Sequence, residues 1–195
     1  MCGLDAKILL HHGGMRRRHD AQFTGPKERV LDMDLSIDAT DLAERLGMAL
    51  ENRAWTVTAA ESCTGGLFAG ALTAIPGSSA WFLGSVVTYA NRAKTSLAGV
   101  PPGVLEGHGA VSKNTVEAMA RGAAARLEAN MAVAISGIAG PDGGVPGKPV
   151  GTVWIAVAGP HTIQTRMHRF DGDRHTVRMQ AVIAALRATL KALET

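Results

Sequence analysis

The chain has few of the residues that cross-link small secreted proteins or that stack on nucleic-acid bases. Only two cysteines, Cys2 and Cys63, occur among 195 residues, and they lie far apart in different contexts. This spacing argues against a disulfide framework, and we expect a reducing, cytoplasmic compartment. Aromatic residues make up only 4% of the chain, which leaves few rings for binding single-stranded nucleic acid by stacking.

Strong charge and long apolar segments are also missing. The formal net charge is +3, and the densest basic run, residues 16–19, lies in a segment without helical or strand periodicity. The apolar run at residues 8–10 is too short for a signal-peptide core, and no uninterrupted apolar stretch approaches the length that spans a bilayer. We therefore expect neither nucleic acid nor a membrane as a partner.

Length and composition favour one globular domain preceded by a tail. The hydrophobic share of 46% is typical of a packed α/β core. Residues 1–35 mix charges, histidines and glycines without clear periodicity, so they are predicted to form a disordered or flexible N-terminal tail. The domain is predicted to span residues 36–195, beginning with a helix in which Leu42, Leu46 and Leu50 recur at four-residue intervals.

The rest of the chain alternates predicted strands and helices. Apolar and β-branched runs predict strands near residues 55–60, 83–89, 131–136, 152–157 and 162–169, the last two paired as a hairpin. Helical spacing predicts helices near residues 67–72, 91–94, 112–130 and 173–193. This order implies an α/β fold, specifically a three-layer α/β/α sandwich with a mixed, mostly parallel sheet.

The most informative motif is Glu61-Ser62-Cys63-Thr64-Gly65-Gly66, at the junction between the first predicted strand and the helix after it. Backbone N–H groups at the start of a helix are unpaired and carry positive charge, and glycine lets a substrate approach the backbone. The Ser62 hydroxyl beside such donors suits attack on a carbonyl or the binding of a phosphate. The motif alone leaves both open, and it also suits a plain helix cap.

Two further segments end at the same predicted edge of the sheet, where ligands of α/β proteins bind. Tyr89 ends the second strand with Lys94 just beyond it, and Ser136 ends the third. The convergence favours a serine and lysine pair for acyl transfer, in which a desolvated, neutral Lys94 takes the proton of Ser62. Lys94 as a solvated charge and Tyr89 as a plain strand end remain the alternatives.

Other chemistries are less favoured by the pattern. A histidine triad would need a histidine beside Ser62, but His108, His161, His168 and His175 fall elsewhere, and no Gly-x-Ser-x-Gly elbow occurs. Cys63 is a rival nucleophile, although it reads more readily as a small buried residue. Asp142 and Asp173 are too few carboxylates for a metal signature.

Five sequence blocks together resemble the CinA C-terminal family, the nicotinamide-nucleotide amidohydrolases. The blocks are residues 61–66, 87–94, 109–112, 136–144 and 172–174. The resemblance covers about residues 38–193. It implies hydrolysis of the carboxamide of nicotinamide mononucleotide, which gives nicotinate mononucleotide and ammonia in pyridine-nucleotide salvage, and it implies neither a cofactor nor a metal.

The resemblance also assigns site residues. It implies that Ser62 is the nucleophile, that Lys94 is its base, and that Tyr89 lines the site and assists the serine. Arg174 is the candidate for the substrate phosphate, because a guanidinium matches phosphate geometry. The remaining expected substrate-binding residues are Thr64, Gly65, Gly66, Asn91, Ser136, Gly137, Ala139 and Gly140.

Relatives in this family are often named competence-damage proteins. The alternative function is therefore a non-catalytic nucleotide-binding or partner-binding module linked to DNA uptake. We also expect a homo-oligomer, because the closing hairpin offers an exposed edge and the Trp81-Phe82 pair is apolar.

Overall fold

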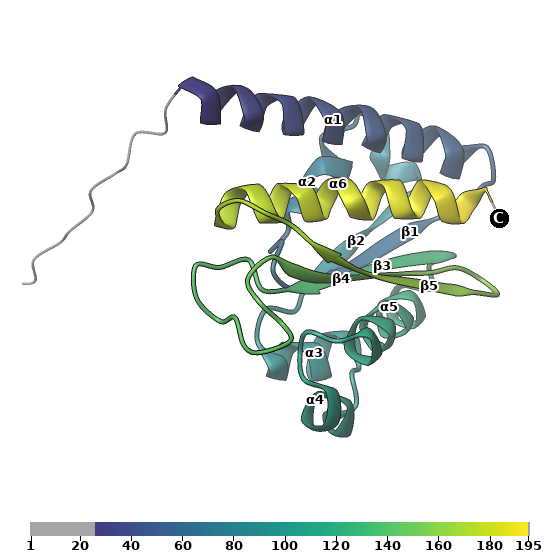
Figure 1. Ribbon diagram of the computed structural model, residues 1–195. Coiled ribbons are helices and arrows are strands. Elements are labelled where there is room, and N and C mark those ends of the chain that lie inside the picture. Colours follow the sequence, from purple (N-terminus) through teal and green to yellow (C-terminus); the bar gives the residue numbers. More distant parts are fainter. Residues whose placement is uncertain (1–25, 195) are drawn as a thin grey trace, which may run out of the picture.

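In the computed structural model, which describes residues 26–194 and the side chains from residue 35 onward, a five-stranded sheet lies between two layers of helices (Figure 1). The strands are β1 (Val57–Glu61), β2 (Phe82–Val87), β3 (Met131–Gly137), β4 (Thr152–Ala158) and β5 (Ile163–Arg169). The helices are α1 (Pro26–Glu51), α2 (Leu67–Thr73), α3 (Asn91–Ala98), α4 (Pro102–His108), α5 (Lys113–Leu127) and α6 (Arg174–Leu193). The predicted three-layer α/β fold is confirmed.

The strand order is β2-β1-β3-β4-β5. Strand β1 pairs in parallel with both β2 and β3, whereas β4 runs antiparallel to its neighbours β3 and β5. The carboxyl ends of β1, β2 and β3 therefore meet at one edge of the sheet. This edge is where the predicted site residues converge.

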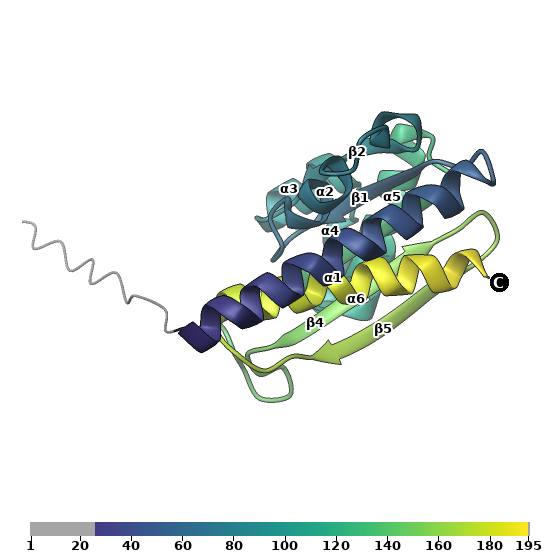
Figure 2. The same cartoon turned by 90° about the horizontal axis from the view of Figure 1, so that it is seen from above.

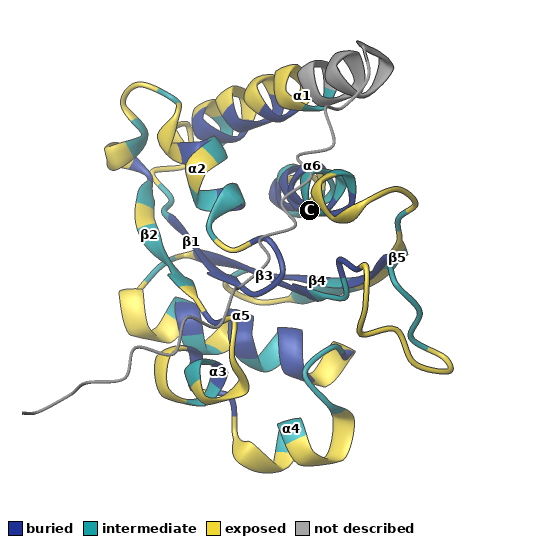
Figure 3. Ribbon diagram, turned by 90° about the vertical axis from the view of Figure 1, so that its left-hand side faces the viewer, coloured by how far each residue is buried: buried dark blue, intermediate teal, exposed yellow. Residues whose placement is uncertain are grey.

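Each face of the sheet packs on its own helical layer (Figure 3). On β3, Met131, Val133 and Ile135 belong to the core shared with α1, α2 and α6, whereas Ala132 and Ala134 belong to the core shared with α3 and α5. The small alanine side chains let α5 lie close to the sheet.

Close packing of α5 also fixes α3, the helix that carries Lys94. A Cβ atom added at Gly122 of α5 would overlap the carbonyl oxygen of Ala98 at the end of α3. The backbones of the two helices thus approach at a point where only glycine fits.

On the opposite layer, α1 and α6 lie side by side across the sheet (Figure 2). Trp81 packs into this layer and is only 2% exposed, and a Cβ atom at Gly47 of α1 would lie 2.8 Å from its ring. The Trp81-Phe82 pair is therefore part of the core rather than a surface for self-association, which corrects one basis of the expected homo-oligomer. The other basis, the exposed edge of the closing hairpin, stands because β5 is an edge strand. Oligomerisation remains a prediction that light scattering can test.

Two boundaries differ from the sequence-based expectation. Helix α1 begins at Pro26, so residues 26–35 of the expected tail are helical, and residues 1–25 lie outside the described residues. Helix α4 was not among the predicted helices. Pro102 occupies its first turn, where a missing backbone N–H costs nothing.

Between residues 26 and 194, none of the helices combines the length and the apolar composition that a membrane crossing requires.

Candidate active site

Ser62 directly follows the fully buried strand β1 and is fixed by the sheet. Its backbone N–H donates to the carbonyl of Ile135 on β3 at 2.9 Å, and the residue is 7% exposed. The chain then turns through Gly65 and Gly66, whose φ angles of +60° and +98° lie in the left-handed region. Since glycine adopts this region without steric cost, the motif places Ser62 on a tight turn between β1 and α2.

The partial positive charge at the start of α2 is neutralised by Glu61, to which the sequence analysis assigned no role. Its carboxylate is fully buried and accepts the backbone N–H groups of Gly66, Phe68 and Ala69 at 3.0, 3.1 and 2.9 Å. The Ser85 hydroxyl donates to the same carboxylate at 3.2 Å. We expected these helix donors to face a substrate, but the carboxylate occupies them, and an anion at a helix N-terminus is stabilising.

Lys94 projects from α3 toward the turn that holds Ser62. Its Nζ lies 3.0 Å from the Ser62 Oγ and donates to the carbonyls of Thr88 at 2.8 Å and Tyr89 at 3.2 Å. The lysine is only 1% exposed. The predicted serine and lysine are therefore neighbours in a buried setting.

Burial lowers the pKa of Lys94 below its ordinary value of 10.5, because desolvation disfavours the ammonium form. A neutral amine has two N–H donors and one lone pair. The two carbonyls take the donors, and the lone pair is then free to accept the Ser62 hydroxyl proton. The geometry thus suits a lysine that acts as a general base.

A cavity of about 180 Å³ opens beside Ser62 and Lys94. Three predicted segments supply most of its wall, as expected from the convergence of the strand ends. The predicted residues that line it are Ser62, Tyr89, Asn91, Lys94, Ser136, Gly137, Ala139 and Arg174. Cys63, Ala110 and Val111 complete the lining, and the Ser136 hydroxyl, which donates to the Ala110 carbonyl at 2.8 Å, ties β3 to this segment.

Two arginines on the first turns of α6 hold the loops around the cavity. Arg174 donates to the Gly140 carbonyl at 2.9 Å and to the Tyr89 hydroxyl at 3.1 Å. Arg178 donates to the carbonyls of Cys63 and Thr64 at 3.0 and 2.8 Å. Helix α6 therefore braces both the turn of the serine and the loop after β3.

The other predicted binding residues, Thr64, Gly65, Gly66 and Gly140, do not line the cavity. The Thr64 side chain is fully buried, the Gly66 N–H is bonded to Glu61, and the Gly140 carbonyl receives Arg174. Their positions shape the turn and the loop. Direct substrate contacts from these residues remain a prediction.

Two residues that support the site, Glu61 and Arg178, were not predicted, although the sequence contains a signal for each. Glu61 is an acidic residue between a buried strand and a helix start, a place where a carboxylate satisfies N–H groups. Arg178 follows Arg174 by four positions on α6, so both lie on one helix face.

The residues that the sequence offered for a cysteine nucleophile, a metal site or a histidine triad have other roles or positions in the structure. Cys63 is buried, which raises the pKa of its thiol to about 11 and leaves it without a thiolate near neutral pH. Asp173 caps α6 by accepting the N–H of Thr176 at 2.8 Å. The four histidines that we weighed for a triad do not line the cavity, and no group of three His, Cys, Asp or Glu side chains in the described part of the chain is placed to hold a metal ion.

Comparison with known proteins places the chain among close relatives. A family model described as the CinA C-terminal domain matches residues 39–193. The chain is 54% identical over 152 residues to the nicotinamide-nucleotide amidohydrolase PncC of Pseudomonas putida, covering 78% of this chain and 95% of that protein. The protein of the same name from Escherichia coli K12 is 53% identical over 146 residues, covering 74% and 88% of the two chains.

A solved structure has the same fold. The crystal structure of a competence-damaged protein (CinA) superfamily member from Klebsiella pneumoniae superposes with a TM-score of 0.78 at 41% identity, covering 80% of this chain and 98% of that one.

Proposed function

Because the chain belongs to the CinA C-terminal domain family and is an amidohydrolase, we propose that it hydrolyses the carboxamide of nicotinamide mononucleotide. The products are nicotinate mononucleotide and ammonia, and the reaction serves pyridine-nucleotide salvage. Ser62 is the nucleophile and Lys94 is its base. The observation that carries the mechanism is the 3.0 Å separation of Lys94 Nζ and Ser62 Oγ in a buried setting.

The reaction proceeds in two halves. The Ser62 Oγ attacks the carboxamide carbon while its proton passes to the neutral Lys94 Nζ. The Lys94 ammonium then returns the proton to the departing nitrogen, which leaves as ammonia, and an ester to Ser62 remains. Water attacks this ester as Lys94 takes a proton from it, and Ser62 leaves with that proton to release the carboxylic acid.

The oxyanion needs donors other than the start of α2, since Glu61 occupies the N–H groups of Gly66, Phe68 and Ala69. We assign this role to the backbone N–H of Cys63, the residue of the turn that lines the cavity. Arg178 orients that turn by donating to the carbonyls of Cys63 and Thr64. Fixed donors of this kind stabilise the charge that develops on the carbonyl oxygen.

The size of the cavity indicates how the substrate enters. At about 180 Å³ it is smaller than the pockets of roughly 300–1,000 Å³ that enclose drug-sized ligands. It accommodates a single ring with its amide, so the ribose and phosphate lie at the mouth. The exposed residues there include Tyr89 and Arg174, and the guanidinium of Arg174 is our candidate for the phosphate.

An ammonia-release assay with nicotinamide mononucleotide tests the proposal. The parent protein should release ammonia, Ser62→Ala should not, and Lys94→Met, which keeps the length and burial of the side chain, should lower kcat by about 10²–10⁴-fold. Lys113→Met, which alters an exposed lysine on α5, is the matched control and should behave as the parent. Full activity of Ser62→Ala would refute the nucleophile.

The same assay separates the enzyme from a non-catalytic module. If the parent and both variants bind the nucleotide equally and none releases ammonia, a binding module linked to DNA uptake becomes the better description. Turnover of a different carboxamide, with nicotinamide mononucleotide untouched, would keep the chemistry and replace the substrate.

A further inference from the structure

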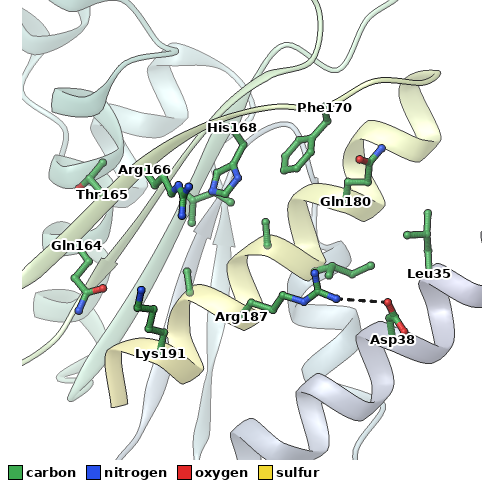
Figure 4. Close-up of a pocket in the computed structure, with 14 residues that line it drawn as sticks. Leu35, Asp38, Gln164, Thr165, Arg166, His168, Phe170, Gln180, Arg187 and Lys191 are labelled. Atoms are coloured by element: carbon green, nitrogen blue, oxygen red, sulfur yellow. Dashed lines mark ion pairs between the residues drawn. The ribbon is translucent and has the colours of Figure 1, made fainter. Parts of the chain in front are cut away.

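A second cavity, larger than the one beside Ser62, lies in a groove between β5, α6 and α1 (Figure 4). Its volume is about 640 Å³, within the range of roughly 300–1,000 Å³ that is typical of small-molecule sites. None of the residues that line the catalytic cavity lines this groove. The groove has no role in the proposed amide hydrolysis.

Basic side chains enter the groove from both walls. Arg166 and His168 are two residues apart on β5 and therefore lie on the same face of that strand. Arg187 and Lys191 are four residues apart on α6 and share one face of that helix. In Figure 4, Arg166 and His168 come from the strand and Lys191 from the helix. Arg187 of the same helix extends toward Asp38 of α1.

Among the residues whose side chains the structure describes, the lining holds little negative charge to balance these groups. Asp38 of α1 is the one acidic residue in that part of the lining, and it pairs with Arg187 at 3.6 Å. Burial, and secondarily the charge of Arg166, lower the pKa of His168 below its ordinary value of 6.5, which favours the neutral imidazole. The three permanent cations outnumber the single carboxylate, so the groove favours an anion.

The floor of the groove is apolar and its walls offer flat surfaces. Ile155 and Ile183 form part of the floor. The His168 and Phe170 rings are stacked, with centroids 5.3 Å apart and an angle of 12° between their planes. Guanidinium and aromatic planes suit a flat ring better than a flexible aliphatic chain.

We propose that this groove is a second ligand site, which binds a nucleoside phosphate. The phosphate lies among Arg166, Arg187 and Lys191, and the base lies over the apolar floor beside the His168-Phe170 pair. Gln180 also lines the groove; its amide nitrogen donates to the carbonyl of Asp171 at 2.8 Å, and its amide oxygen can accept from a base or a ribose. The site is separate from the proposed catalysis, and it does not depend on amide hydrolysis.

Isothermal titration with adenosine monophosphate tests the site. The double variant R166E/K191E should lose at least tenfold in affinity, because both changes replace a cation with an anion. The control is R169E, which repeats the R166E charge reversal on β5 but outside the groove lining, and it is compared with R166E as well as with the double variant. Equal affinities in R166E/K191E and R169E would overturn the proposal, since binding at the catalytic cavity would persist in both.

Two further measurements keep the result interpretable. If the double variant does not fold by circular dichroism, the single variants Arg166→Gln and Lys191→Gln should each weaken binding by a smaller factor. Inorganic phosphate should bind more weakly than adenosine monophosphate and compete with it. Binding of octanoate in the groove, with no binding of adenosine monophosphate, would overturn the assignment to nucleotides.

Discussion

The guanidinium of Arg174 donates to the hydroxyl of Tyr89, 3.1 Å away, and to the carbonyl of Gly140, 2.9 Å away. The first contact joins α6 to the segment between β2 and α3, and the second joins α6 to the loop after β3. An exposed guanidinium is thus fixed at the mouth of the catalytic cavity. A cation held in this way is ready to bind a phosphate with little loss of side-chain entropy.

Replacing Arg174 with alanine should therefore raise KM for nicotinamide mononucleotide by tenfold or more, since a charge-assisted hydrogen bond contributes about 1.5–3 kcal/mol. The KM for nicotinamide riboside, which lacks the phosphate, should change much less. Steady-state kinetics with both substrates provide the comparison.

The matched variant is Arg92→Ala, because Arg92 lines a neighbouring recess next to Asn91. If Arg92→Ala raises KM selectively for the phosphorylated substrate and Arg174→Ala does not, the phosphate assignment moves to Arg92.

The burial of Lys94 predicts the pH dependence of activity. The amine must be neutral to accept a proton, and burial lowers its pKa below 10.5. The value of kcat/KM should thus rise with pH by about tenfold per unit at low pH and level off at an inflection below 10.5. A pH–rate profile checks this expectation, and an inflection at or above 10.5 would contradict a desolvated base.

Much of this arrangement followed from the sequence because the strands of the sheet are short and bounded by clear signals. Strand β1 ends at Glu61, directly before Ser62, and β3 ends at Gly137, one residue after the predicted Ser136. Helix α6 starts directly after Asp173, as predicted. Parallel strands bring such ends to one edge, so the meeting of Ser62 and Lys94 was predictable from order alone.

The contacts that support the site were harder to predict, because they depend on side-chain direction over long sequence separations. Arg178 reaches the carbonyl of Cys63 across 115 residues, and no local pattern near either residue signals that contact. The sequence suggested that Trp81 lies at the surface. Its burial depends on a close contact with α1 at Gly47, where a residue with a side chain would crowd the ring. The spacing of residues predicts which side chains share a face of a helix, but tertiary packing decides which element covers that face.

The thiol of Cys63 lies next to the proposed nucleophile, and its chemistry can be tested directly. Burial raises its pKa to about 11, so almost no thiolate exists near neutral pH. Cys63→Ala should retain kcat within a few fold, and treatment of the parent with iodoacetamide should leave ammonia release intact. Rapid inactivation by the reagent, with protection by substrate, would instead favour a cysteine nucleophile.

The buried carboxylate of Glu61 makes a prediction that links stability to catalysis. It accepts three backbone N–H groups at the start of α2 and the hydroxyl of Ser85. In Glu61→Gln, the side-chain NH₂ would face backbone donors, and the negative charge at the helix start would be lost. The free energy of unfolding should fall by about 1.5–3 kcal/mol, as measured by urea denaturation.

Glu106→Gln is the matched control, since Glu106 is an exposed carboxylate on α4, and its unfolding free energy should stay within about 0.5 kcal/mol of the parent. In the folded Glu61→Gln protein, kcat should fall more than KM rises, because the turn that carries Ser62 loses its anchor while the proposed phosphate site at Arg174 is unchanged. Equal stability of Glu61→Gln and the parent would mean that the carboxylate does not hold the turn.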